Sequence, residues 1–291
     1  MIPISKGKIN SAKKVVIYGP EGIGKSTLAA KFPNPVFIDT EGSTKELDVA
    51  RFPCPKLWTD IIIDVDDLLT ERHFSTLVID TADWAEQLCI KFVCETQGVK
   101  GIEDIGYGKG YVYAAEEFQK LLRLCDQLIE AGINVVFTAH AMMRKFEQPD
   151  ELGAYDRWEM KLSKKIAPLL KEWADMVLFC NYKTNVITDS KTKSKKATGG
   201  SRIIYTSHHP CWDAKNRYEL PDVIDMDFAP IASLFNGVEV KAAEPDYRAE
   251  LKKFINGDKA LMQKIIADNK LGPTSTNDDY KKALENAKGG N

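Results

Sequence analysis

The sequence predicts an α/β protein with a mostly parallel sheet flanked by helices. Apolar runs of strand length alternate with stretches of helical character, at 14–18, 35–39, 76–80, 133–139 and 176–181. Strands separated by helices pair in parallel, because each helix returns the chain across a face of the sheet. A later strand-rich segment, 184–206, predicts an antiparallel β-hairpin extension.

The composition supports a folded core and excludes several classes of protein. Hydrophobic residues make up 44% of the 291 residues, enough for a core and too many for global disorder. The net charge of -2 gives no overall basic field, so contacts with nucleic acid would need local patches. The 6 cysteines form no CxxC pair and there is no signal peptide, which predicts reduced thiols and a cytoplasmic location. No apolar run approaches the roughly 20 residues that span a bilayer, so no membrane contact is expected.

The first predicted strand leads into a glycine-rich turn. Residues 15–30 are VVIYGPEGIGKSTLAA, in which GPEGIGKS matches the pattern G-x-x-x-x-G-K-[ST] at each fixed position. Glycines let backbone N–H groups surround phosphate oxygens, and the positive end of the following helix points at them. Lys25 is expected to reach the β- and γ-phosphates, and Ser26 to bind Mg²⁺. The expected nucleotide-binding residues are Gly19, Pro20, Glu21, Gly22, Ile23, Gly24, Lys25, Ser26 and Thr27.

The second predicted strand ends in two carboxylates. Residues 35–44 are PVFIDTEGST, which place Asp39 and Glu41 at or just past the strand end. Hydrolysis of ATP needs a carboxylate that orients and deprotonates a water near the γ-phosphate, and Glu41 is the candidate base. The alternative is that both carboxylates cap the segment that follows.

The third predicted strand also ends in a carboxylate. Residues 75–84 are STLVIDTADW, and Asp80 follows the apolar run. A carboxylate at this end of a strand, in a sheet that carries a phosphate-binding loop, can support the metal ion. The alternative is that Asp80 caps the helix that starts near Trp84. The sequence has no N-K-x-D guanine signature, so ATP with Mg²⁺ is the expected cofactor.

Four segments, taken in order, resemble those of RecA-type ATPases. YGPEGIGKSTL resembles their P-loop, FIDTEG the strand that ends in the catalytic glutamate, and NVVFTAHAMMRK the strand that ends in the γ-phosphate sensor. The resemblance makes Glu41 catalytic and His140 the sensor, where the family has Gln. AKNRYELP resembles the segment in which two cations flank an asparagine and contact the ATP of a neighbouring subunit. Those cations are Lys215 and Arg217, the latter in place of the usual second Lys.

The whole arrangement is similar to phage-encoded nucleotide-binding proteins with a minimal RecA core, over about residues 10–235. Some of those proteins act as single-strand annealing recombinases. The resemblance implies a RecA-like ATPase whose homo-oligomer holds ATP at subunit interfaces, binds single-stranded DNA and promotes annealing or homologous recombination. It also implies a single-strand-binding protein as a helper. The alternative is a nucleotide-switched P-loop module of phage replication or assembly, with little affinity for DNA.

One candidate DNA segment precedes the helix that leads to the sensor strand. Residues 98–118 are glycine-rich and carry Tyr107, Lys109 and Tyr111 at alternate positions. Flexible backbone, aromatic faces and a cation suit single-strand binding without sequence preference. The alternative is a structured turn that caps a helix from Val112.

A second candidate follows the sensor strand. Residues 142–162 are expected to form an ordered or semi-ordered loop in which Arg144, Lys145 and Arg157 meet DNA, although nearby acidic residues oppose this. The alternative is a packing loop. A lysine-rich stretch at 190–202 is expected to be an exposed hairpin tip, which either is simply solvated or captures a phosphate backbone.

The chain is expected to divide into three parts. Residues 1–236 form the RecA-like core, 237–247 a polar linker, and 248–291 a small helical region outside the resemblance. Apolar spacing predicts one helix over 246–267, and a last helix follows the break GPTSTND.

Overall fold

The computed structural model describes residues 6–147, 153–188, 195–241, 247–256, 258–271 and 275–289. The chain forms two compact units, Met1–Lys241 and Ala242–Asn291, each with a hydrophobic core of its own. The division falls inside the segment 237–247. Residues just before it still pack on the first unit, where the Lys241 N–H donates to the carbonyl of Ala131 at 2.8 Å.

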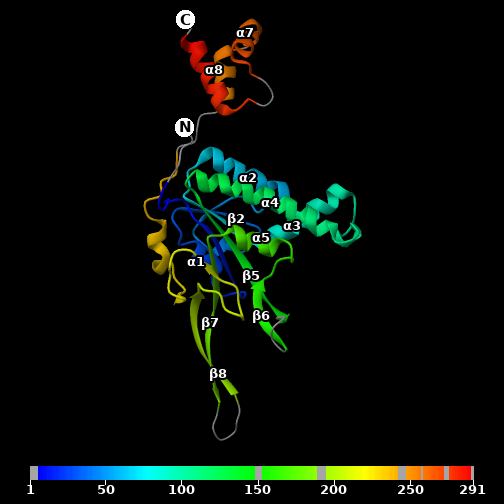
Figure 1. The fold of residues 1–291 in the computed structure, drawn as a ribbon, viewed down its shortest axis with the longest axis vertical. Coiled ribbons are helices and arrows are strands. Elements are labelled where there is room, and N and C mark those ends of the chain that lie inside the picture. The colour runs from blue at the N-terminus through cyan, green and yellow to red at the C-terminus, as the bar shows by residue number, and fades with distance from the viewer. Residues whose placement is uncertain are drawn as a thin grey trace. The chain divides into compact units, whose positions relative to one another are not determined.

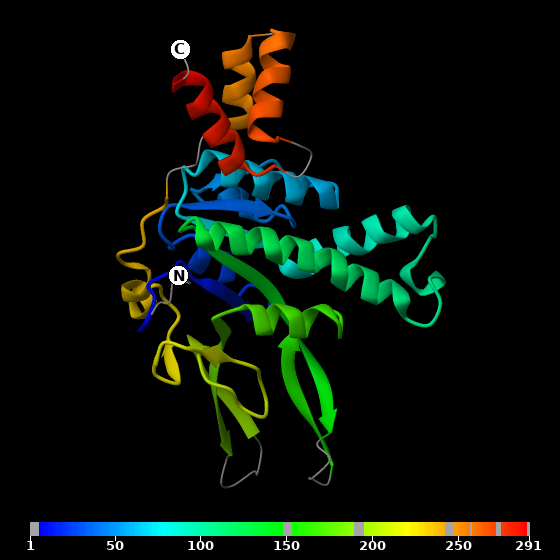
Figure 2. The same ribbon diagram turned by 45° about the horizontal axis from the view of Figure 1, so that its top comes forward.

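The first unit combines a large sheet with helices on both faces (Figures 1 and 2). The strands are β1 (Lys14–Gly19), β2 (Pro35–Asp39), β3 (Ala50–Arg51), β4 (Thr76–Asp80), β5 (Asn134–Glu147), β6 (Ala154–Met160), β7 (Met176–Thr188), β8 (Lys195–Tyr205), β9 (Lys215–Asn216) and β10 (Val223–Asp225). The helices are α1 (Lys25–Ala29), η1 (Thr44–Glu46), α2 (Trp58–Glu71), α3 (Ala82–Gln97), η2 (Ile102–Asp104), α4 (Lys109–Glu130), α5 (Ile166–Trp173) and η3 (Ala229–Phe235).

The strand order confirms the predicted fold class. Among the described residues the sheet runs β10-β8-β7-β1-β5-β4-β2-β3, with β6 paired to β5 and β9 to β7. The neighbours from β7 across to β3 are parallel, whereas β6, β8, β9 and β10 pair antiparallel. Parallel strands all end at the same edge of the sheet, so β1, β2, β4 and β5 bring the predicted site residues to one place.

Side chains on β1 alternate between two cores. Val16 and Tyr18 pack in the cluster with α2, α3, α4 and α5, whereas Val15 and Ile17 pack in the cluster with α1 and η3. Successive side chains of a strand point to opposite faces, so a strand apolar at each position is buried on both. The run VVIY therefore specifies a central strand rather than a half-exposed one.

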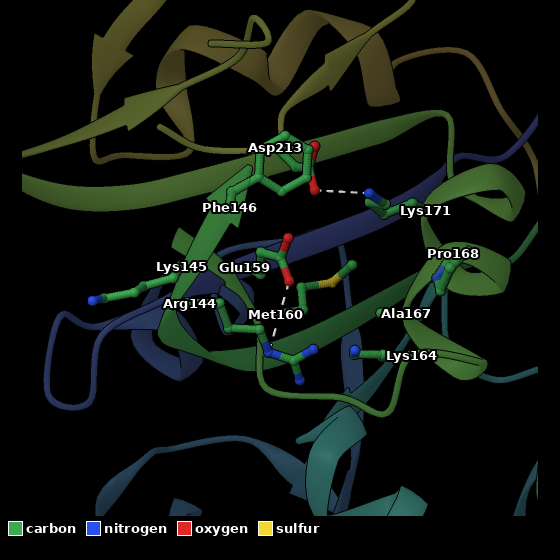
Figure 3. Close-up of a pocket in the computed structure, with 10 residues that line it drawn as sticks. All are labelled: Arg144, Lys145, Phe146, Glu159, Met160, Lys164, Ala167, Pro168, Lys171 and Asp213. Carbon is green, nitrogen blue, oxygen red and sulfur yellow. Dashed lines mark hydrogen bonds and ion pairs between the residues drawn. The ribbon is translucent and has the colours of Figure 1, made fainter. Parts of the chain in front are cut away.

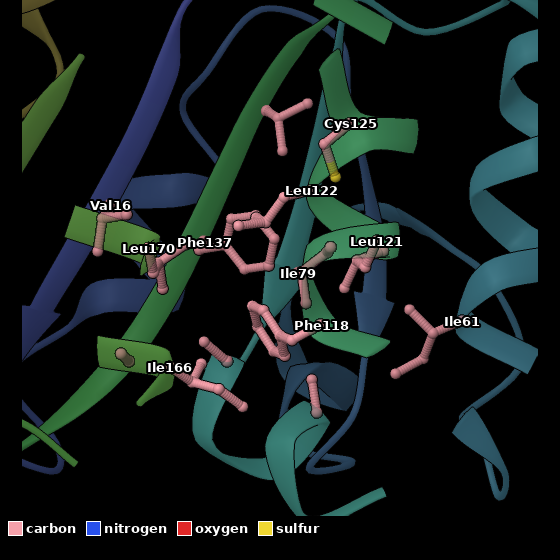
Figure 4. Packing of buried hydrophobic residues seen from close by; sticks show 14 of the residues in the cluster. Val16, Ile61, Ile79, Phe118, Leu121, Leu122, Cys125, Phe137, Ile166 and Leu170 are labelled. Atoms are coloured by element: carbon pink, nitrogen blue, oxygen red, sulfur yellow. The ribbon is translucent and has the colours of Figure 1, made fainter. Parts of the chain in front are cut away.

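Aromatic packing fixes α4 on the sheet. Phe118 of α4 lies against Phe137 of β5 with ring centroids 6.3 Å apart, and both side chains are fully buried (Figure 4). Burial of one such ring stabilises the fold by roughly 1.5–3 kcal/mol relative to exposure. This contact anchors β5, the strand that carries His140.

Strands β7 and β8 continue past the sheet as an antiparallel hairpin, which confirms the predicted hairpin extension (Figure 1). The hairpin tip, 189–194, lies outside the described residues, so the proposed role of Lys191 and Lys193 is not addressed.

The segment 142–162 is mostly a second hairpin rather than the expected loop. Strand β5 extends beyond the end predicted at 139 and pairs with β6 from Ala141↔Met160 to Glu147↔Ala154. Phe146 and Tyr155 pack edge to face across the two strands, at 5.6 Å between centroids. Such cross-strand aromatic pairs stabilise a hairpin.

The second unit consists of α6 (Tyr247–Ile255), α7 (Lys259–Asn269) and α8 (Asn277–Gly289). The single helix predicted at 246–267 is thus two helices. Asn256 has a left-handed backbone, φ 46°, which ends α6. The Asp258 carboxylate accepts from the Leu261 N–H at 3.0 Å and starts α7. The unit's apolar core is Leu251, Ile255, Ile265, Ala283 and Leu284.

Candidate functional site

The glycine-rich turn forms a loop between β1 and α1. A Cβ on Gly19 would lie 2.3 Å from the carbonyl oxygen of Cys180, so no side chain fits there. Gly24 has φ 105°, a left-handed backbone that favours glycine, and directly precedes α1. The loop therefore has the shape that lets successive N–H groups face an anion at a helix N-terminus.

The Lys25 side chain is buried beneath this loop. Its Nζ donates to the carbonyls of Gly19 at 3.1 Å and Pro20 at 3.0 Å. Burial lowers the pKa of Lys25, and the carboxylates of Asp80 and Asp83 oppose that shift. The ammonium group thus lies inside the loop, where it can meet a phosphate.

Asp80 ends β4 and is completely buried. Its Oδ1 accepts a hydrogen bond from the Thr138 hydroxyl, whereas Oδ2 has no partner among the described residues. Burial raises the pKa of Asp80, and the hydrogen bond from Thr138 and the nearby Ser26 hydroxyl oppose the rise. The peptide bond that follows, Asp80-Thr81, is cis.

The oxygens of Ser26 and Asp80 fit Mg²⁺. Mg²⁺ prefers oxygen ligands and is commonly held by one or two protein groups together with phosphates and water. An unsatisfied buried carboxylate oxygen beside a hydroxyl provides those groups. Among the described residues no cluster of three or more His, Cys, Asp or Glu could hold a metal ion.

Asp39 and Glu41 have different environments. Asp39 accepts from the N–H groups of Gly42 at 2.7 Å and Thr44 at 2.9 Å, so it caps the turn after β2. Glu41 lies within that turn, and as a whole residue it is exposed, although its carboxyl is partly shielded from solvent. Burial of its carboxyl and the neighbouring Asp80 charge raise its pKa, which His140 opposes. Capping, offered as the alternative for both residues, thus applies to Asp39.

His140 lies at the end of the sheet portion of β5 and is buried. Its Nδ1 lies 2.9 Å from Asp83 Oδ2, and its N–H donates to Asp83 Oδ1 at 3.0 Å. Burial would raise the pKa of Asp83, but the hydrogen bonds from His140 lower it below the ordinary value. Asp83 is absent from the predicted site. It lies three residues after Asp80, yet only the packing of α3 beside β5 reveals its partner.

Arg202 is a second residue that sequence reasoning missed. It extends from β8, and its Nη1 donates to the carbonyl of Ile23 in the loop at 3.2 Å. A Cβ on Gly24 would lie 2.9 Å from the same nitrogen. In the sequence this arginine is merely the last residue of a basic hairpin stretch.

A comparison with known families agrees with this geometry. A family model described as an AAA domain (AAA_24) matches residues 11–218, from before β1 to just after β9. The chain belongs to this AAA domain family. Family and fold together make the protein a P-loop NTPase, with the loop Gly19–Thr27 at its centre. A search of curated proteins found no match.

Lys215 and Arg217, the two cations expected to contact ATP, lie far from the P-loop of their own AAA domain. Lys215 pairs with Val177 near the start of β7, and its Nζ donates to the carbonyls of Lys171, Glu172 and Ala174 at 2.6–3.0 Å. Burial lowers the pKa of Lys215, as does the Arg217 charge. Its contacts cap the C-terminus of α5.

Arg217 lies at the same end of the sheet. Its Nη1 binds Asp175 Oδ1 at 2.9 Å, and Asp175 is hydrogen-bonded to Lys14 at the start of β1. Strand β1 has 6 residues from Lys14 to Gly19, which corresponds to about 16 Å of strand. Within one chain, Lys215 and Arg217 are therefore separated from the phosphate site.

The first predicted DNA segment of the AAA domain is a turn followed by a helix. Tyr107 is fully exposed with a left-handed backbone, φ 55°. Helix α4 begins at Lys109 rather than near Val112, so Lys109 and Tyr111 lie on its first turn. The Tyr111 hydroxyl donates to Glu103 at 2.7 Å, so this ring is tied to its own chain.

The second predicted DNA segment borders a cavity of about 330 Å³ between the β5–β6 hairpin and α5 (Figure 3). Arg144 lies 3.7 Å from Glu159 there, whereas Lys145 extends away from the cavity. Arg157 is buried and ion-paired with Asp213, which corrects the expectation that it meets DNA. The neighbouring strands and the Asp213 carboxylate hold its guanidinium inside the fold.

None of the helices in the described part of the protein has the length and apolar character of a membrane span. The adjacent His208, His209 and Cys211 form no metal cluster, and His209 instead stacks on Trp212 at 4.1 Å between ring centroids.

Proposed function

We propose that the protein is a RecA-like ATPase that oligomerises on single-stranded DNA and promotes annealing or homologous recombination. The observation that carries the ATPase part is the convergence, at one edge of the sheet, of the P-loop, Asp80, Glu41 and His140. The P-loop follows β1, Asp80 ends β4 and Glu41 lies just past β2, while His140 is the last β5 residue that pairs in parallel with β1. The parallel sheet therefore brings them together.

In this proposal each residue has one chemical role. Lys25 contacts the β- and γ-phosphates of ATP, and Ser26 and Asp80 hold Mg²⁺, which when bound neutralises phosphate charge. Glu41 takes a proton from water while the water oxygen bonds to the γ-phosphorus and the bond to the β–γ bridging oxygen breaks. His140, positioned by Asp83, donates to the γ-phosphate and responds to its loss.

The positions of Lys215 and Arg217 support an oligomer with ATP between subunits. Both cations lie at the amino end of β7 and cannot reach the phosphates of their own chain. A cation that stabilises the transition state must touch the transferring phosphate. If they act in catalysis, they act on the ATP of a neighbouring copy, as the resemblance to RecA-type ATPases implies.

Exposed groups outside the nucleotide site support the DNA part. Tyr107 offers an aromatic face, and Lys109 and Lys145 offer exposed cations. Stacking and phosphate contacts are the two interactions that sequence-tolerant single-strand binding needs. A single-strand-binding protein as helper is part of the proposal through the resemblance alone.

The test is a fluorescence anisotropy titration of a labelled oligonucleotide, with and without a nonhydrolysable ATP analogue. We expect binding that tightens with the analogue and weakens steeply with salt, because phosphate contacts release counterions. Lys145→Ala and Tyr107→Ala should each weaken binding, whereas Lys91→Ala, at an exposed position of α3, should not. Absence of binding under every condition contradicts the DNA part.

One observation favours the alternative of a nucleotide-switched binding module. Arg144 is ion-paired with Glu159, and Arg157 with Asp213, so two of the predicted DNA cations already have carboxylate partners within the fold. That alternative predicts ATP turnover that is independent of oligonucleotide. Measurement of the ATPase rate with and without single-stranded DNA separates the two functions.

A further inference from the structure

We propose that Arg202 and Met226, on the β8–β10 edge of the sheet, form the binding site for the α-phosphate and nucleoside end of the nucleotide. The inference rests on the nucleotide-binding part of the proposed function and is independent of its DNA part. Neither residue belongs to a nucleotide-binding motif of the sequence. The ligand class is a nucleoside di- or triphosphate.

The first step is the position of the two side chains over the P-loop. Arg202 Nη1 donates to Ile23 O at 3.2 Å, and the Met226 Cε lies 3.7 Å from the Cβ position of Gly24. The backbone N–H of Met226 donates to the carbonyl of Arg202 at 3.4 Å, so the two residues are held side by side.

The strand register explains why they reach the loop. Arg202 pairs with Tyr182, two residues beyond Cys180, whose carbonyl lies directly against Gly19. Ile204, two residues from Arg202, and Ile224, two from Met226, both pack in the core beneath α1. By strand alternation, Arg202 and Met226 therefore face the same side as α1 and lie above the loop.

The second step is the direction of the nucleotide. Asp80, Glu41 and His140, which serve the γ-phosphate end, belong to β4, β2 and β5 on one side of β1. Strands β8 and β10 lie on the other side, beyond β7. A triphosphate whose γ end faces the first group directs its α-phosphate and nucleoside away from it, toward the second.

The chemistry of the two side chains fits that end of the ligand. A guanidinium group binds phosphate oxygens with directed, charge-assisted hydrogen bonds. A methionine side chain is flexible and polarizable and adapts to the face of an aromatic ring such as a base. The nearby Asp227 carboxylate pairs with Lys31 at 2.6 Å, so its charge is compensated.

The experiment is isothermal titration calorimetry of the full chain with ATP, ADP and inorganic tripolyphosphate, each with Mg²⁺. Arg202→Ala should lower the affinities for ATP and ADP by the same factor, about 10- to 100-fold for one lost charge-assisted hydrogen bond. Arg202→Lys should lose less. Met226→Ala should weaken ATP and ADP while tripolyphosphate binds as in the wild type. Arg123→Ala, an exposed arginine on α4, is the matched control.

Three results would overturn the inference. Loss confined to ATP would make Arg202 a γ-phosphate contact, and equal affinities in Arg202→Ala and Arg123→Ala would make it a structural residue of the hairpin. If Met226→Ala weakens the binding of tripolyphosphate as much as the binding of ATP, then Met226 does not contact the nucleoside. If the wild type binds none of the three ligands, the nucleotide-binding premise itself fails, which is distinct from these results. Unchanged far-UV circular dichroism verifies that each variant is folded.

Discussion

At the scale of single residues, environment separates carboxylates that the sequence places together. The Asp39 carboxylate accepts hydrogen bonds from three backbone N–H groups and one hydroxyl of the turn that it caps. Glu41 lies two residues further along, and none of its carboxyl oxygens caps the turn. Partial shielding of this carboxyl from solvent and the Asp80 charge raise its pKa. A base with a raised pKa accepts a proton more readily, which suits activation of water near neutral pH.

Glu41→Gln should therefore lower the ATPase turnover by about 100-fold or more, the size of a lost general base. ATP affinity should stay close to wild type, because Gln keeps the shape of the side chain. Single-turnover hydrolysis and calorimetry measure the two quantities. Glu46→Gln, an exposed residue of η1, controls for loss of charge in the same turn, and unchanged turnover in Glu41→Gln would show that another group is the base.

At the scale of elements, the C-terminal carbonyls of α5 are capped by a side chain from outside the helix. Its last turn directs carbonyls at the ammonium of Lys215, which lies over 40 positions further along the chain. A cation at a helix C-terminus interacts favourably with the helix dipole and satisfies carbonyls that have no partner within the helix. Lys215 thus has a structural role in its own chain, whatever it does for a neighbour.

Lys215→Met should lower the free energy of unfolding by about 1–2 kcal/mol, because the carbonyls lose their charged donor while the apolar stem stays. Urea unfolding measures the change. Lys165→Met at the N-terminus of the same helix is the control and should be neutral or slightly stabilising. Equal stability of the Lys215 variant and wild type would contradict the capping role.

Helix α2 has three neighbouring aspartates, Asp60, Asp64 and Asp67, and the burial of Asp64 together with their mutual repulsion makes the stability of the fold depend on pH. Burial, together with the Asp60 and Asp67 charges, raises the pKa of Asp64 from 3.8 to about 6. The folded chain then holds the proton more tightly than the unfolded chain. The contribution of Asp64 to stability is thus full below pH 3.8 and lost as pH rises through about 6.

Asp64→Asn should accordingly raise the melting temperature at pH 8, and the gain should shrink as the pH falls toward 4. Asp66→Asn removes the same charge from an exposed position of α2 and should change little at either pH. Thermal melts of the three proteins across this range measure the difference. A gain that grows toward acid would reverse the assigned sign of the shift.

At the scale of the whole molecule, the two ends of β1 define two halves of a proposed shared site. The P-loop lies at one end, and Arg217 lies with Asp175 at the other. Only a second copy can bring these halves together, so the proposed activity depends on assembly.

Arg217→Ala and Lys25→Ala should each inactivate the proposed homo-oligomer, by roughly 10³-fold or more if Arg217 is a true finger. Mixing the two variants should restore activity, because about a quarter of the interfaces in an equal, random mixture join intact halves. ATPase assays of the separate and mixed proteins test this. No gain on mixing, with subunit exchange verified by light scattering or labelled subunits, would contradict a shared site.

Much of the site could be predicted because its signals are local. The motif GPEGIGKS implies the loop geometry. The strand ends are also marked in the sequence, because VVIY is followed by Gly19 and TLVID ends in Asp80. Strand β5 was predicted too short because its outer half, MMRKFE, carries mixed polar and apolar residues. That half is stable only through its pairing with β6.

The sequence alone determined the α/β class, the P-loop and the order of the carboxylates at the strand ends. These follow from hydrophobic periodicity and from residue types at short, fixed spacing. Only the tertiary structure decided that Asp83 holds His140, that Arg157 is buried against Asp213 and that Arg202 reaches Ile23, 179 positions away. Such pairs depend on strand register and on how helices pack on the sheet, and these are set by the sum of many distant contacts rather than by any local stretch of sequence.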